Sequence, residues 1–94
     1  MQAHVYISGF VVGVGFRQFV KHAAKKNAVT GWVKNLPDGR VAALLQGVKE
    51  NIETVIAECK KGPFLSEVEN VEVVWEEAKE NYVTFDIVDK ADIY

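Results

Sequence analysis

Residues 9–17 join a predicted strand to a predicted helix and read Gly9-Phe10-Val11-Val12-Gly13-Val14-Gly15-Phe16-Arg17. The preceding residues alternate between two faces, which predicts a strand over residues 3–11. The following residues place apolar side chains on one face of a helix: Phe16, Phe19, Val20, Ala23 and Ala24. The sequence therefore predicts that the fold begins with a strand, a glycine-containing turn and a helix.

The rest of the chain continues this alternation of strand and helix patterns. Strands are predicted over Thr30–Leu36 and Arg40–Gln46, because Pro37-Asp38-Gly39 between them is a hairpin turn signal. Ile52, Val55, Ile56 and Cys59 form the apolar stripe of a second helix, which Gly62 and Pro63 end. Two further strands are predicted over Val68–Trp75 and Tyr82–Val88.

The order β-α-β-β-α-β with an added final strand predicts an α+β fold. Its simplest arrangement is an antiparallel sheet with two helices on one face, the ferredoxin-like split βαβ sandwich. The sequence contains no linker, repeat or low-complexity segment. We therefore expect a single domain over residues 1–94.

Composition narrows the possible function classes. The 94 residues are 49% hydrophobic and 26% charged, and the formal net charge is −2, so non-specific nucleic-acid binding is disfavoured. No apolar run approaches the roughly 20 residues that a membrane helix needs. Cys59 is the only cysteine, which favours a reducing compartment. We expect a cytoplasmic monomer without a cofactor, metal site, nucleic-acid partner or membrane contact.

The glycine-rich stretch is a candidate anion site. Glycines bring backbone N–H groups close to an anion, whereas a cation such as Arg17 at a helix start opposes the macrodipole by roughly 0.3–1 kcal/mol. A phosphate or carboxylate beside Arg17 would remove that penalty. The alternative is a turn that only lets the helix pack on the sheet. The stretch is not a Walker A loop, and Val11 occupies the position of the nucleophile in a Cys-x5-Arg phosphatase loop.

The residues near the stretch include no acid–base group. His4 and His22 are interpreted as surface residues outside any pair, and Cys59 as core. A mixed anhydride of phosphate suits such a site, because its carboxylate leaves without protonation. Asn35 is a second candidate, since its carboxamide can hold a neutral water, although asparagine before Leu-Pro-Asp-Gly is also an ordinary turn residue.

Several ordered motifs resemble the acylphosphatase family over essentially the whole chain. They are Gly13-Val14-Gly15-Phe16-Arg17, Thr30-Gly31-Trp32-Val33-Lys34-Asn35 before an Asp-Gly turn, Gly62-Pro63, the valines Val68 and Val71, and Phe85-Asp86-Ile87. The resemblance implies an enzyme that hydrolyses the carboxyl–phosphate bond of small acyl phosphates without a metal. It also implies that Arg17 binds the phosphate and Asn35 positions water. By the same resemblance, the phosphate cradle is expected to be completed by the backbone amides of Val12, Gly13, Val14, Gly15 and Phe16.

This chain departs from the family pattern at two positions. Phe10 and Val12 stand where the family loop usually carries arginine and glutamine. The backbone donors survive both changes, but local charge and polarity fall. The departures leave open a catalytically weakened anion-binding or interaction domain of the same fold.

An RNA-binding module is a further alternative. Residues 13–20 superficially resemble the aromatic signature of RNA-recognition domains, but that signature lies on a central strand. Here the same residues open a helix. Arg17, Lys21 and Lys25 recur every four residues. Trp32 and Trp75 are interpreted as core or half-buried sheet residues. The acidic residues 76–80 are interpreted as a solvated turn.

Overall fold

The strands and helices follow one another as the sequence predicts. The computed structural model describes residues 1–88, so the last six residues of the predicted domain lie outside it. The elements are β1 (Gln2–Phe10), α1 (Phe16–Lys26), β2 (Thr30–Asn35), β3 (Val41–Gln46), α2 (Lys49–Lys61), β4 (Glu67–Glu76) and β5 (Phe85–Val88).

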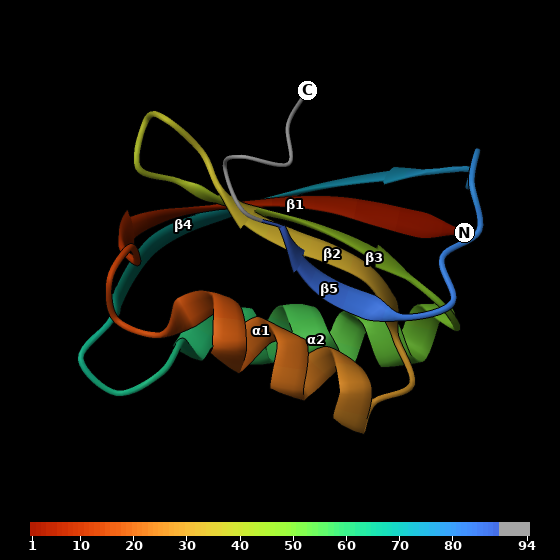
Figure 1. Cartoon of the computed structure of the whole chain (residues 1–94), viewed down its shortest axis with the longest axis horizontal. Helices are drawn as coiled ribbons and strands as arrows, with labels where there is room; N and C mark the ends of the chain where they lie inside the picture. Colours follow the sequence, from red (N-terminus) through yellow and green to blue (C-terminus); the bar gives the residue numbers. More distant parts are fainter. Residues whose placement is uncertain (89–94) are drawn as a thin grey trace.

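The strands form one sheet in the order β4-β1-β3-β2-β5. The pairs β1–β3, β1–β4 and β2–β3 are antiparallel, as predicted, whereas β5 joins β2 in parallel. The sheet is therefore mixed, because the chain crosses from β4 at one edge to β5 at the other. Both helices cover the same face of the sheet (Figure 1). The ferredoxin-like α+β fold is confirmed.

The core lies between this sheet face and the helices. The stripe of α2 is buried as predicted, and in α1 Phe16, Val20, Ala23 and Ala24 are buried while Phe19 packs partly buried against them. Alternate residues of β1 and β3 meet them from the sheet, including Val5, Ile7 and Leu45. The periodicity of each element therefore sets which side chains form the core.

The predicted start of β5 is three residues too early. The strand begins at Phe85 rather than Tyr82. The backbone N–H of Tyr82 donates instead to the side-chain oxygen of Gln46, and Gly31 donates to the carbonyl of Thr84. Residues 82–84 thus approach the sheet through individual bonds before the regular ladder begins.

The other face of the sheet is covered by its own side chains. Ala42 and Leu44 are buried there although no helix lies above them. Rings and long cations close over this face: Lys34 lies 4.8 Å from the Trp32 ring centroid, and Arg40 lies 5.3 Å from that of Tyr6. Because Val41, Ala43 and Leu45 belong to the core on the other face, all six residues of β3 are buried.

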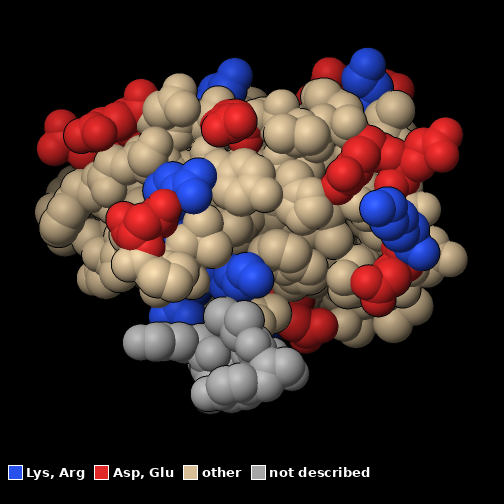
Figure 2. Space-filling view, turned by 90° about the horizontal axis from the view of Figure 1, so that it is seen from above, with Lys and Arg blue, Asp and Glu red and all other residues tan. Residues whose placement is uncertain are grey.

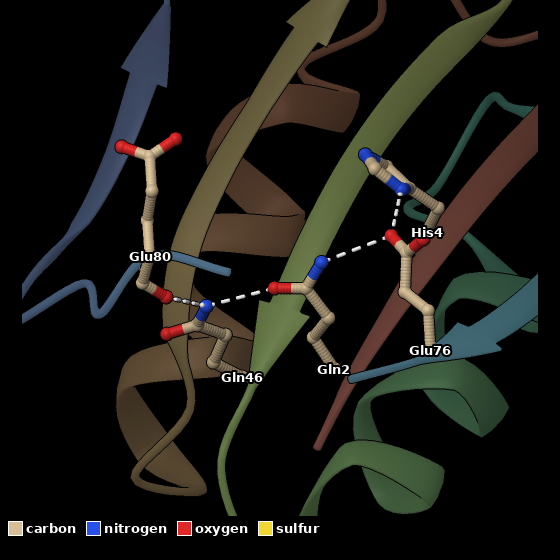
Figure 3. Close-up of polar contacts among 5 residues, drawn as sticks. All are labelled: Gln2, His4, Gln46, Glu76 and Glu80. Atoms are coloured by element: carbon tan, nitrogen blue, oxygen red, sulfur yellow. Dashed lines mark hydrogen bonds and ion pairs between the residues drawn. The ribbon is translucent and has the colours of Figure 1, made fainter. Parts of the chain in front are cut away.

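A polar network joins three strands on this face (Figure 3). Gln46 donates to Gln2, Gln2 donates to Glu76, and His4 Nδ1 lies 2.6 Å from the same Glu76 oxygen. The bonds from Gln2 and His4 hold the pKa of Glu76 below its usual value. The interpretation of His4 as a residue outside any pair is wrong, because strand pairing brings it beside a carboxylate 72 positions away.

The two tryptophans lie on strands of the sheet and are partly exposed. Trp32 is half-buried on the open face, and Trp75 on edge strand β4 is 38% exposed.

Figure 2, seen from the side of the open face, shows acidic and basic side chains in small separate groups with uncharged surface between them. Within residues 1–88, neither helix has the length and apolar character that crossing a bilayer requires.

Candidate active site

The loop between β1 and α1 depends on left-handed backbone at two glycines. Gly13 has φ of 81° and Gly15 has φ of 78°, conformations that cost an L-residue about 1–2 kcal/mol. A Cβ at either position would meet nothing within 4 Å. These glycines are therefore required by backbone conformation and not by close packing.

The start of α1 presents backbone donors toward the loop. Gly15 is the N-cap residue, and no side chain of the described residues caps the helix. The first turn holds no acidic residue and contains Arg17 instead. The unsatisfied N–H groups of such a turn favour an anion, and the guanidinium adds a formal positive charge.

Asn35 ends β2 on the sheet face that the helices cover. Gly31 and Val33, which precede it at alternate positions, are buried on that face. Strand alternation therefore directs the Asn35 side chain toward the helix layer, and α1 packs against β2. The hairpin that follows is closed by Leu36 and Arg40, as the Pro-Asp-Gly signal predicts.

One cavity of about 480 Å³ brings the main candidates together. Arg17 and Asn35 line it, together with Gly13, Gly15 and Phe16 of the predicted cradle. Val12 and Val14 do not line it; Val12 is 42% exposed. Five of the seven predicted residues thus meet at one site. The remaining two belong to the same loop, where Val14 packs partly buried against the core.

Five further residues line the cavity and were not predicted from the sequence as site residues. They are Val11, Gln18, Lys21, Asp86 and Ile87. Asp86 and Ile87 come from β5, which reaches the site only because it pairs in parallel with β2. Lys21 lies one helical turn after Arg17, so the four-residue spacing of cations was the available signal.

The two positions that depart from the family pattern are both at the surface. Phe10 is 59% exposed at the end of β1. Val12 follows in the loop and is also exposed. Core packing therefore does not explain why apolar residues stand at these positions.

Comparison with known proteins identifies the family. The family model described as acylphosphatase matches residues 3–87. The chain belongs to the acylphosphatase family. It is 44% identical over 88 residues to an acylphosphatase of Chloroflexus aurantiacus, covering 94% of this chain and 96% of that protein. An acylphosphatase of Thermococcus kodakarensis is 48% identical over 77 residues, which are 82% of this chain and 85% of that one.

A solved acylphosphatase has the same fold. The crystal structure of the Bacillus subtilis protein superimposes with a TM-score of 0.90 at 37% identity, over 93% of this chain and 97% of that chain. The family resemblance predicted from the sequence is confirmed. The acylphosphatase function predicted with it is supported by relatives that carry this name over nearly their whole length.

Proposed function

We propose that this acylphosphatase hydrolyses small acyl phosphates at the cavity formed by the β1–α1 loop, Arg17 and Asn35. One observation carries the proposal: a guanidinium, a carboxamide and a left-handed glycine loop line the same 480 Å³ cavity. Each group suits one part of the reaction. The family assignment supplies the bond that is broken, the carboxyl–phosphate anhydride.

In this proposal the loop and Arg17 bind the phosphoryl group. The backbone N–H groups of residues 12–16 surround its oxygens, and the planar guanidinium donates to two of them. These contacts strengthen as negative charge gathers on the phosphoryl oxygens in the transition state. In this proposal Val12 and Val14 contribute only their backbone N–H groups, and neither residue is among those that line the cavity.

Asn35 holds the attacking water. Its carboxamide both accepts and donates hydrogen bonds, so it orients a neutral water without removing its proton. The water oxygen attacks phosphorus while the bond from phosphorus to the acyl oxygen breaks, and the carboxylate leaves with that electron pair. The water proton passes to the phosphate. Positioning of this kind needs no residue that acts as a general base.

The proposal is tested by phosphate release from benzoyl phosphate in the presence of a chelator. Arg17→Ala should lower kcat/KM by an amount equivalent to about 3–5 kcal/mol, because it removes a charge-assisted contact to the transition state. Arg17→Lys should also fail, since an ammonium cannot reproduce the planar fork. Asn35→Ala should lower kcat far more than it weakens competitive inhibition by inorganic phosphate.

The controls separate catalysis from folding. Each variant should keep the urea unfolding midpoint of the wild type within a small margin, because Arg17 and Asn35 are only half-buried. Full turnover by Asn35→Ala would remove its assigned role. If the wild-type protein binds phosphate but does not hydrolyse benzoyl phosphate, the chain is instead the catalytically weakened binding domain. That alternative arises from Phe10 and Val12, which are both exposed.

The remaining expectations form part of the same proposal. We propose a cytoplasmic monomer of one domain that acts without nucleic acid or membrane. The RNA-binding alternative is disfavoured because the resembling residues lie in a loop and in α1, with Phe16 only 1% exposed. Bases cannot stack on a ring in that position.

A further inference from the structure

A second cavity lies on the open face of the sheet, at the end where β1 begins and β4 finishes. Its volume is about 290 Å³. Strands β1, β2, β3 and β4 supply part of its lining, and the connection from β4 to β5 supplies the rest. Among the described residues, none lines both this cavity and the active-site cavity. A ligand bound here would therefore occupy a separate site.

Three rings and one leucine form the apolar walls of this cavity. The rings belong to His4, Trp32 and Tyr82, and Leu44 beside them is only 4% exposed. The His4 ring packs edge-on against the Trp32 ring, with centroids 5.9 Å apart. The Trp32 ring also contacts a cation, because Lys34 Nζ lies 4.8 Å from its centroid. Lys34 itself does not line the cavity. Walls of this kind bind flat apolar groups and attract cations.

Two hydrogen-bond acceptors of the cavity are left over from the polar network. Glu76 Oε1 accepts from Gln2 and lies 2.6 Å from His4 Nδ1 (Figure 3). Within residues 1–88, Glu76 Oε2 and His4 Nε2 make no hydrogen bond. A neutral imidazole whose Nδ1 proton is directed at Glu76 presents Nε2 as an acceptor. Both atoms are therefore available to a ligand that donates N–H groups.

The charge of the lining also favours a cation. Of the described residues that line the cavity, Glu76 and Glu80 carry carboxylates and Lys79 carries an ammonium. The bonds from Gln2 and His4 hold the pKa of Glu76 below its usual value, so this carboxylate is ionised at neutral pH. The network fixes Glu80 through its backbone carbonyl, which accepts from Gln46. The exposed side chain of Glu80 remains at the cavity.

We propose that this cavity binds a small organic cation, an amidinium or guanidinium carried on a flat apolar body. The forked cation donates to Glu76 Oε2 and His4 Nε2, while the flat body lies among the rings. A planar fork suits the site better than an ammonium, because it presents several N–H groups in one plane and stacks on aromatic faces. The inference does not rest on the proposed function, since the two cavities share no described residue.

The test compares benzamidine with benzamide, which has nearly the same shape but no charge. Titrations follow indole fluorescence in Trp75→Phe, where Trp32 is the only tryptophan. We expect a saturable change with a Kd of about 1 mM for benzamidine and at least about tenfold weaker binding of benzamide. The reciprocal variant Trp32→Phe keeps only Trp75, which lies outside the cavity, and should give no response.

Carboxylate variants in the Trp75→Phe background test the contact to the cation. Glu76→Gln should weaken benzamidine binding about tenfold and change benzamide binding little. Because Glu76→Gln also alters the polar network, Glu80→Gln provides a second variant that leaves the side-chain bonds of the network intact. We expect it to cost about threefold in affinity. The matched control is Glu77→Gln, which removes an exposed charge next to Glu76 but outside the cavity and should cost less than about twofold.

Four results would overturn the inference. The first is no saturable response to benzamidine, and the second is equal affinity for the two probes, which would mean that the cavity does not select a cation. An equal response from Trp32→Phe would place the binding elsewhere on the protein. Displacement of benzamidine by inorganic phosphate would place it in the active-site cavity. None of these measurements involves hydrolysis of benzoyl phosphate, so a failure of the proposed function is distinguishable from all four.

Discussion

Cys59 and Arg17 differ in accessibility, and this difference separates a structural side chain from a reactive one. Cys59 is fully buried in the α2 stripe, and burial raises the pKa of its thiol to about 12. A thiol attacks only as the thiolate, so this side chain is chemically silent in the folded protein. Arg17 is half-buried and lines the active-site cavity. Burial thus assigns the thiol to packing, whereas the guanidinium lies at the candidate active site.

Cys59 should therefore resist alkylation until the protein unfolds. At pH 8 iodoacetamide should label the native thiol at least about 100-fold more slowly than the urea-unfolded thiol, measured by mass spectrometry over time. Native labelling should still rise above pH 9, where an ordinary thiol reaches its plateau, because the raised pKa keeps the thiol protonated. Exposed Ala78 provides the control, as Ala78→Cys in a Cys59→Ala background. Equal rates for the two thiols would contradict burial of Cys59.

A functional role could be predicted from the sequence for a residue whose charge is unfavourable in its local structure. An anion site was predicted beside Arg17 because this cation opposes the helix dipole. The structure places Arg17 in a cavity with Asn35. The four-residue spacing places Lys21 on the same helix face as Arg17, but it does not show what lies opposite that face. That opposite wall is β5, far along the chain.

At the scale of elements, β2 combines a close backbone approach with a candidate catalytic residue. Gly31 has φ of 135°, and an added Cβ would lie 1.8 Å from the Leu44 carbonyl oxygen of β3. Gly31 also donates its N–H to Thr84, which leads into β5. The missing side chain of Gly31 thus allows β3 to approach closely, and Asn35 stands four residues further along the same strand.

Gly31→Ala should be far more destabilising than Gly39→Ala. Gly39 in the hairpin turn also has positive φ, at 91°, but an added Cβ there would meet nothing within 4 Å. We expect about 1 kcal/mol for Gly39→Ala and at least about 3 kcal/mol for Gly31→Ala, because only the latter must displace backbone. Urea unfolding with a common m-value measures both. Equal losses would show that β2 and β3 can separate without cost.

Elements with strong periodicity were predicted well, and those fixed by distant partners were not. The two helix stripes and the Asp-Gly hairpin follow from local spacing, and all are confirmed. The parallel pairing of β5 depends on where the chain goes after β4, which no local pattern records. For the same reason, the contribution of β5 to the active-site cavity was not predicted.

At the scale of the molecule, the buried network on the open face fixes this crossover. Gln46 is 7% exposed and makes three contacts that bridge separate segments: it donates to Gln2 and to the Glu80 carbonyl, and it accepts from the N–H of Tyr82. Glu80, which is drawn in Figure 3, and Tyr82 both belong to the connection that carries the chain from β4 to β5. The network at one end of the sheet thereby positions the strand that supplies Asp86 and Ile87 to the cavity.

Gln46→Leu should loosen this connection and weaken the site from a distance. Leucine has similar volume, but it removes the Gln46 partner of the Tyr82 N–H, the Gln2 side-chain oxygen and the Glu80 carbonyl, at a cost of about 2–3 kcal/mol in unfolding free energy. Because β5 then pairs less firmly with β2, hydrogen exchange at Ile87 should accelerate and KM for benzoyl phosphate should rise while kcat changes less. The control is Asn81→Leu, an exposed amide in the same connection. If Gln46→Leu lowers stability without altering exchange at Ile87 or KM, the network supports the fold but does not set the position of β5.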